Sequence, residues 1–351
     1  MQTLPTDLPI VFSAVAGLVI GNWLAEWIVR LTEEQPVAGG LACPRCGLQC
    51  SRMRRIPLAG WFLRGRCRGC GGPVARWMLA VEIGNGILFA AFAWLLLVAW
   101  CHDIEPHGEN EPSESLARLV HYLVLIALLV AATGTDLRRY VVPDQITLPG
   151  ALFAMAMSAA FGSQQLTPVW MEWRSPAGLP QLRYAELPEW IAAHPHWHGF
   201  AASLAGLIAG AGLVWLVRAI SRLLLGREAL GFGDVTLMGM IGSFVGWQAA
   251  VLIAMLAPLT GIVAATAVRL TSHRTMLPYG PWLCLATLIV IGGWRWIWMF
   301  ELETGPREKL MLRELFGDPA LLGILGGISL VALVLLLGLL RSYKSIPVGR
   351  R

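Results

Sequence analysis

Apolar segments close to the length of a membrane span recur along the whole chain, and they limit what it can fold into. A helix needs about 20 mainly apolar residues to cross the hydrocarbon layer. Hydrophobic residues make up 56% of the sequence and charged residues only 14%, against about 25% charged residues in soluble domains. We therefore expect an all-α polytopic membrane protein with about nine transmembrane helices. The predicted spans are Pro9–Leu31, Met78–Trp100, Leu116–Thr133, Ile146–Phe161, Gly199–Ile220, Val235–Trp247, Ala249–Leu270, Pro281–Phe300 and Pro319–Leu340.

Two of these predicted spans are short for a full crossing. Ile146–Phe161 and Val235–Trp247 each follow directly on a turn that carries an aspartate. Irregular backbone at membrane depth is tolerated only where protein or water satisfies its polar groups. The two segments therefore indicate a buried polar site beside them.

The distribution of charge predicts the orientation. Residues 32–77 contain eight arginines, whereas the next loop, residues 101–115, has five acidic residues and no Lys or Arg. By the positive-inside rule the first segment is cytoplasmic and the second is outside. With nine spans the N-terminus lies outside and the C-terminus is cytoplasmic, and the first span is retained because MQTLPTDLP lacks the basic region of a signal peptide. The net charge of +5 then reflects topology and requires no nucleic-acid partner.

Four cysteines in the cytoplasmic segment have the spacing of a metal site. Cys43 and Cys46 form one C-x2-C pair, and Cys67 and Cys70 form a second pair 20 residues later. Such a set suits tetrahedral zinc, and a closed four-cysteine site is structural. Two disulfides are the alternative, but a reducing compartment disfavours them. Cys50 is either a bystander or a competing ligand.

Three aspartates, Asp136, Asp144 and Asp234, are predicted at the cytoplasmic ends of spans. Taken singly, Asp144 and Asp234 each fit a helix cap. Taken as a pair, two close carboxylates share one proton, so that one acts as a base toward water and the other as an acid toward a scissile carbonyl. Gly231 and Gly233 would let a peptide backbone approach closely.

Several motifs together resemble one family. GFGD at residues 231–234, the segment GTDLRRYVVPDQITLPG, the cysteine loop with IPLAGWFLRGRCRGCGGPVARWMLAVE, and LPYGPW at residues 277–282 are similar to the type IV prepilin leader peptidases. These are GxGD aspartic peptidases of the bacterial inner membrane. The resemblance implies that Asp136 and Asp234 are the catalytic pair. Asp144 matches a position that reads Asp or Asn in the family pattern, and it is left out of the pair.

The same resemblance implies substrates and cofactors. The family removes the leader peptide of type IV prepilins and type II secretion pseudopilins on the cytoplasmic side. It then methylates the new N-terminus with S-adenosylmethionine. We also expect structural zinc as a cofactor, bound in the cysteine loop, and the lipid bilayer as a partner.

The chain departs from the family pattern at three places. Thr236 stands in place of a lysine, and Asn22 and Ala25 stand in place of a serine and an asparagine in the first span. The substitutions in the first span leave open whether methylation is retained. A ninth span and the loop 162–198 are additional. These departures motivate an alternative function, a catalytically altered scaffold for pilin or secretion assembly. A transporter that couples to protons is a third hypothesis, but it would need acidic residues at mid-depth in the membrane.

These features divide the chain into four parts. Residues 1–31 are the first transmembrane helix, and residues 32–77 are the zinc-binding loop. Residues 78–300 are the peptidase membrane domain, which includes the outside loop 162–198, and residues 301–351 add a helix and a basic tail. That loop contains His194, His196 and His198; we expect them in an interfacial aromatic belt, with a metal site as the alternative.

Overall fold

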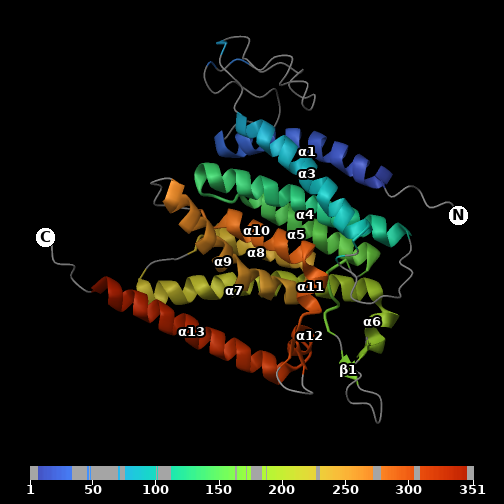
Figure 1. Cartoon of the computed structure of the whole chain (residues 1–351), viewed down its shortest axis with the longest axis vertical. Helices are drawn as coiled ribbons and strands as arrows, with labels where there is room; N and C mark the ends of the chain where they lie inside the picture. The colour runs from blue at the N-terminus through green and yellow to red at the C-terminus, as the bar shows by residue number, and fades with distance from the viewer. Residues whose placement is uncertain are drawn as a thin grey trace.

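The protein is a bundle of helices that lie roughly side by side (Figure 1). The computed structural model describes residues 7–33, 46, 48, 70–71, 76–99, 101, 112–162, 164–170, 172–174, 184–186, 188–226, 230–271, 278–303 and 309–345. In Figure 1 the helices α1 and α3 form one side, α7 and α13 form the other, and α4, α5, α8, α9 and α10 lie between them. The long helices are α1 (Asp7–Glu33), α3 (Arg76–Leu97), α4 (Pro112–Arg139), α5 (Asp144–Phe161), α7 (Pro195–Leu225), α8 (Phe232–Val245), α9 (Trp247–Thr271), α10 (Gly280–Gly292) and α13 (Pro319–Ser345).

The predicted helical segments coincide with these helices, with one difference. The expected span Pro281–Phe300 is broken at Gly293 into α10 and the short helix α11 (Trp294–Trp298). The backbone amide of Arg295 donates to the carbonyl of Cys101 at 2.9 Å. This bond ties the start of α11 to a residue that follows α3.

Four helices among the described residues are long and apolar enough to cross a membrane: Leu8–Glu33, Arg76–Leu97, Ser115–Arg139 and Pro195–Leu225. The prediction of a helical membrane protein is confirmed at that level. The nine-span count is not confirmed. Helix α8, at 14 residues, extends about 21 Å against a hydrocarbon thickness of about 30 Å.

Glycines let the helices of the bundle approach closely. A Cβ atom at Gly17 would lie 2.8 Å from the Cβ of Phe89, and one at Gly21 would lie 2.8 Å from the Cα of Glu82, so α1 and α3 pack backbone against backbone. A Cβ at Gly206 in α7 would collide with the carbonyl oxygen of Gly242 in α8. Helix α8 is buried at Val235 and from Leu237 to Val245, and this packing holds it between its neighbours.

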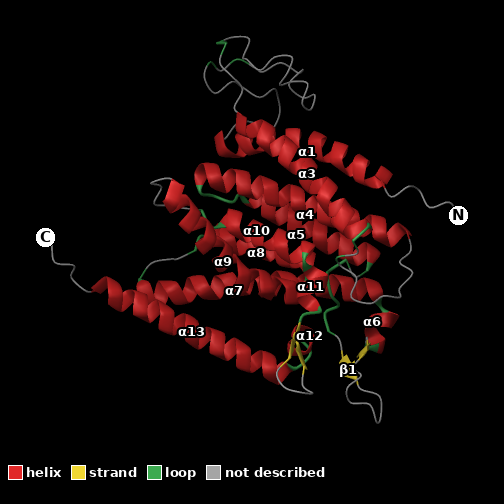
Figure 2. Cartoon of the chain, in the orientation of Figure 1, coloured by secondary structure: helices red, strands yellow, loops and turns green. Residues whose placement is uncertain are grey.

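Short irregular elements gather at one end of the bundle. Strands β1 (Glu172–Arg174) and β2 (Tyr184–Glu186) pair antiparallel, as do β3 (Glu301–Glu303) and β4 (Lys309–Met311). Figure 2 shows these strands, in yellow, with the remainder almost entirely helical. The helices α6 (Glu189–Ala193) and α12 (Leu312–Leu315) lie beside them. The hairpins are an addition to the all-α fold expected from sequence.

The predicted outside loop ends earlier than expected, because α7 begins at Pro195 and includes His196 and His198.

The three histidines His194, His196 and His198 have separate hydrogen-bond partners. His194 and His196 are exposed and bond through Nδ1 to the carbonyls of Ala193 and Ala159, whereas buried His198 accepts the amide of Val169 at Nε2 (3.0 Å). Within the described ranges no group of three potential metal ligands is found.

We predict that Gly206→Ala destabilises the protein by about 1–3 kcal/mol, as expected for overpacking. The added methyl group would meet the Gly242 carbonyl and separate α7 from α8. Gly212→Ala is the matched control on the same helix, because nothing lies within 4 Å of its added Cβ. Thermal unfolding of the purified chain measures both, and equal stability of the two variants would contradict this packing.

Candidate active site

Asp136 lies in the last turn of α4 and is only 5% exposed. Its Oδ2 atom accepts a hydrogen bond from the backbone amide of Gly280 at 3.0 Å. Gly280 is the first residue of α10, where backbone amides have no partner inside the helix and the helix dipole favours negative charge. The N-terminus of α10 therefore satisfies the carboxylate and fixes its position.

Gly280 is required by the closeness of this contact. A Cβ atom at this position would lie 2.6 Å from Oδ2 of Asp136 and 3.3 Å from its Cγ. Any larger residue would push the carboxylate away or displace the start of α10. The motif LPYGPW thus has a geometric role, with its glycine holding Asp136.

The turn after α4 connects the helix that carries Asp136 to α5. Tyr140 adopts a left-handed conformation with φ of 57°, which is uncommon for a residue other than glycine. Its amide bonds to the carbonyl of Asp136 at 2.9 Å and closes the helix. The chain then turns through Val142 into α5.

Asp234 is the third residue of α8, and its Oδ2 atom accepts the backbone amide of Gly231 at 3.0 Å. This bond makes Asp234 a cap of its own helix from within the first turn. The Cα of Gly233 faces the turn after α4, since an added Cβ would lie 3.2 Å from the carbonyl oxygen and 3.3 Å from the Cβ of Val142. Gly231 is exposed, so it is the glycine of this pair that an incoming peptide can reach.

The two carboxylates are close enough to interact electrostatically across the junction of α4 and α8. Both also interact with the Cys284 thiol in α10, and Asp234 interacts with Tyr279, which immediately precedes α10. The C-terminus of α4 and the N-termini of α8 and α10 therefore meet at one end of the bundle.

Two further predicted positions lie apart from this pair. Asp144 is exposed as the first residue of α5, and the N-cap position is occupied by Pro143. The expectation that it caps the helix is therefore wrong. The Thr236 hydroxyl donates to the carbonyl of Gly233 at 3.1 Å, so this residue is engaged with the first turn of α8.

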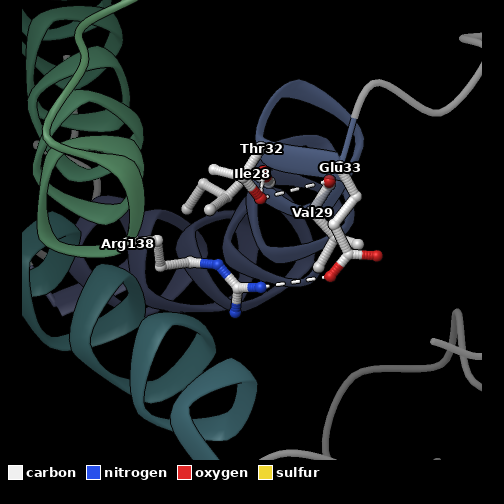
Figure 3. A network of polar contacts seen from close by, with 5 residues as sticks. All are labelled: Ile28, Val29, Thr32, Glu33 and Arg138. Atoms are coloured by element: carbon white, nitrogen blue, oxygen red, sulfur yellow. Dashed lines mark hydrogen bonds and ion pairs between the residues drawn. The ribbon is translucent and has the colours of Figure 1, made fainter. Parts of the chain in front are cut away.

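Polar contacts fix the end of α4 beside Asp136. Arg138 Nη2 lies 3.2 Å from Oε1 of Glu33 at the end of α1 (Figure 3). The guanidinium group of Arg138 also lies 4.5 Å from the ring centroid of Trp77 in α3, within the range of a cation–π contact. These contacts join α1, α3 and α4 close to the carboxylate pair.

A second buried polar group lies between α1 and α3. Glu82 is 2% exposed and accepts Nδ2 of Asn22 at 3.3 Å. Asn85 donates through Nδ2 to the carbonyl of Gly17 at 2.8 Å. Ala25, which replaces the asparagine of the family pattern, is 2% exposed in the same helix as Asn22. Asn22 thus has a polar partner, whereas Ala25 contributes only packing.

The predicted zinc ligands fall largely outside the described residues. Cys46 and Cys70 are exposed, and Cys43 and Cys67 lie outside the ranges that the structure describes. The four-cysteine zinc site therefore stays a prediction.

Sequence reasoning alone did not find the hydrogen-bonding role of Gly280 or the position of Tyr279. The available signal was LPYGPW, in which a glycine and a proline begin an apolar helix. Proline is common at the first helical positions. That pattern predicts a helix start, but it does not reveal which carboxylate accepts a hydrogen bond from the first backbone amide.

Two family models match two separate parts of the chain. Residues 15–96 match the bacterial peptidase A24 N-terminal domain, and residues 189–266 match the type IV leader peptidase family. Asp234 lies inside the second match, and Asp136 lies between the two. No solved structure matches the chain.

Curated relatives named prepilin leader peptidase/N-methyltransferase align with most of the chain. One from Myxococcus xanthus (strain DK1622) is 29% identical over 75% of this chain and 64% of its own length, which is less than two thirds. One from Aeromonas hydrophila is 28% identical over 71% of this chain and 70% of its own length. One from Dickeya chrysanthemi is 28% identical over 72% of this chain and 75% of its own length.

We predict that Asp234→Ala lowers the stability of the protein by about 1 kcal/mol, because it removes the cap bond to Gly231. Asp234→Asn keeps an acceptor oxygen and removes the repulsion from Asp136, so its stability should equal or exceed that of the parent. Thermal unfolding of the purified chain compares the three. If alanine and asparagine gave the same loss, the capping geometry would be wrong.

Proposed function

We propose that the chain is a membrane-embedded aspartic endopeptidase of the type IV leader peptidase family, the family whose model matches residues 189–266. It removes the leader peptide from type IV prepilins or type II secretion pseudopilins at the cytoplasmic face of the bacterial inner membrane. The observation that carries the proposal is the convergence of Asp136 and Asp234, each held by a backbone amide, at one end of the bundle. A structural pair of helix caps would not require the two carboxylates to lie at the same end of the bundle.

In the proposed reaction, one of the two carboxyl groups is protonated and the other is ionised. The ionised group takes a proton from a water molecule as the water attacks the scissile carbonyl. The protonated group donates to the carbonyl oxygen, and protonation of the leaving amine then completes hydrolysis. The amides of Gly280 and Gly231 orient the two groups through their Oδ2 atoms, which leaves each Oδ1 atom for the water or the substrate.

The rim of the site suits a substrate that is apolar next to the cleaved bond. Tyr140, Val141 and Phe232 are each more than half exposed, with values of 56%, 57% and 58%. They belong to the turn after α4 and to the GFGD segment. The hydrophobic segment of a prepilin would pack on these side chains while its leader reaches the two aspartates, with exposed Gly231 giving the backbone access.

The proposal extends to methylation of the new N-terminus with S-adenosylmethionine. Its support is the name that the curated relatives share, prepilin leader peptidase/N-methyltransferase, together with the match to the N-terminal domain over residues 15–96. Mass analysis of the cleaved pilin, with and without S-adenosylmethionine, tests this second activity. An added methyl group that depends on S-adenosylmethionine would support it, and its absence would contradict it.

The wider organisation is part of the same proposal. Residues 32–77 form a cytoplasmic loop folded around structural zinc, residues 78–300 form the peptidase membrane domain, and residues 301–351 add a helix and a basic tail. The N-terminus lies outside and the C-terminus is cytoplasmic. The charge distribution supports this orientation.

We predict that Asp136→Asn and Asp234→Asn each lower the rate of leader removal by about 10³-fold, the order of a lost acid–base group. Both substitutions keep the size and the acceptor oxygen of the side chain. The measurement is cleavage of a purified prepilin by the full chain in membranes. Asp144→Asn is the matched control, since Asp144 is exposed and lies outside the pair, and it should cleave like the parent.

Leader removal that survives either Asp136→Asn or Asp234→Asn would refute the assignment of the catalytic pair. Failure of the parent chain to cut any of several prepilins would favour the scaffold alternative instead.

We predict that the double variant Cys43→Ser, Cys67→Ser loses the bound zinc of the purified protein, because two thiolate ligands are removed from one tetrahedral site. Elemental analysis of the purified chain gives the ratio of zinc to protein. Cys50→Ser is the control and should keep the metal. Unchanged zinc in the double variant would exclude the four-cysteine site.

A further inference from the structure

The last turn of α4 is held from two sides. On one side, Oδ2 of Asp136 accepts the backbone amide of Gly280 in α10. On the other side, Nη2 of Arg138 lies 3.2 Å from Oε1 of Glu33, and its guanidinium carbon lies 4.5 Å from the ring centroid of Trp77. Residues two positions apart are separated by about 200° around a helix, so Asp136 and Arg138 project from nearly opposite faces. The turn that carries Asp136 therefore has contacts on both faces.

The end of α1 packs closely on the same part of α4. Gly134, one turn before Arg138, lies against Ile28, since an added Cβ would collide with Cδ1 of Ile28 and lie 3.1 Å from its Cγ1. The hydroxyl of buried Thr32 donates to the carbonyl of Ile28 at 2.8 Å. Figure 3 shows the side chains of Glu33 and Arg138 pointing toward each other from the two helices. The contact between Glu33 and Arg138 thus extends a helix interface that is already tight.

Arg138 contacts both ends of the predicted cysteine loop, residues 32–77. Glu33 is the last residue of α1, and Trp77 is the second residue of α3. Both lie in residues 15–96, which match the N-terminal family model, whereas Arg138 lies in neither matched region. One side chain therefore connects the N-terminal part of the chain to the helix turn that carries Asp136.

The contacts of Arg138 affect the position of Asp136 rather than its charge. Among the described residues, no electrostatic interaction between Arg138 and Asp136 is found, whereas Gly280 bonds to the carboxylate directly. The planar guanidinium group can pair with a carboxylate and stack on an aromatic ring at the same time. A displacement of Glu33 or Trp77 would therefore reach Asp136 through the orientation of the last turn of α4.

We propose that Arg138 is a positioning residue that connects the turn carrying Asp136 to both ends of the cysteine loop, so that the conformation of those ends controls the position of Asp136. The effect on cleavage rests on the proposed peptidase function. The effect on the helix turn is independent of that function.

Hydrogen–deuterium exchange of the full chain tests the connection itself. The reporter is the amide of Tyr140, which bonds to the carbonyl of Asp136 and closes α4. Arg138→Gln should speed exchange there by about fivefold and Glu33→Gln by about twofold, because the first loses the ion pair and the ring contact and the second only the ion pair. Arg139→Gln is the matched control, since Arg139 is the exposed neighbour and the change in charge is the same. Equal exchange in Arg138→Gln and Arg139→Gln would overturn the proposal.

Double-mutant cycles test whether the two ends of the loop act through Arg138. The effects of Glu33→Gln and of Trp77→Leu on exchange at Tyr140 should disappear when Arg138 is already replaced by glutamine. Trp77→Phe keeps an aromatic ring and should retain most of the protection of the parent. Effects of the same size in both backgrounds would overturn the connection, because the loop ends would then act by another route.

Cleavage of a purified prepilin tests the consequence for the proposed reaction. Arg138→Gln should lower kcat by about tenfold with KM unchanged, because a small displacement of a catalytic group slows the chemical step. Arg138→Lys keeps a positive charge opposite Glu33 and should recover part of the loss, and Arg139→Gln should cleave like the parent. An unchanged kcat in Arg138→Gln would overturn the positioning role. A raised KM with unchanged kcat would also overturn it, since Arg138 would then contact the prepilin.

Two controls keep these results separable. Circular dichroism and size-exclusion chromatography report whether each variant is folded, and Arg138→Lys and Glu33→Gln replace Arg138→Gln if it does not fold. If the parent cleaves no prepilin, the peptidase proposal fails, and the exchange measurements alone decide whether Arg138 connects the cysteine loop to the end of α4.

Discussion

The hydrogen bond between Oδ2 of Asp136 and the amide of Gly280 joins two residues that are 144 positions apart in the sequence and lie in different helices. It places the end of α4 against the start of α10, and no side chain larger than hydrogen fits between them. Burial of a carboxylate is costly unless its oxygens are satisfied. The helix start at Gly280 supplies that satisfaction, and the position of the candidate site follows from it.

The second carboxylate, Asp234, lies in the first turn of α8, a short helix that its neighbours enclose. The glycine contacts between α7 and α8 bury α8 at Val235 and from Leu237 onward, and the bond from Gly231 fixes Asp234 in its first turn. Gly233 packs against Val142 of the turn after α4, which brings the start of α8 to the end of the helix that carries Asp136. Arg218 of α7 contacts the same segment at the ring of Phe232.

The helices could be predicted from the sequence because apolar span length is a local signal, whereas the assignment of Asp136 and Asp234 as a catalytic pair stays a prediction. The break at Gly293 could not, since the bond from Arg295 to Cys101 that positions α11 joins distant segments. The same holds for Gly280 and Asp136, whose contact depends on how α4 and α10 pack. The cap expected at Asp144 failed because Pro143 occupies the N-cap position, a shift of one residue that spacing alone does not resolve.

The kinetics of Gly280→Ala test whether the backbone amide of Gly280 positions Asp136 for the proposed cleavage. The added methyl group would lie 2.6 Å from Oδ2 of Asp136, and a displacement of about 1 Å is expected to lower kcat of leader removal by about 10²-fold. KM should change little, because the substrate-binding rim is untouched. Gly261→Ala in α9 serves as the reference, since its added Cβ would make only ordinary contacts, at 3.9 Å, with Trp282. Cleavage by Gly280→Ala at the rate of Gly261→Ala would contradict the account.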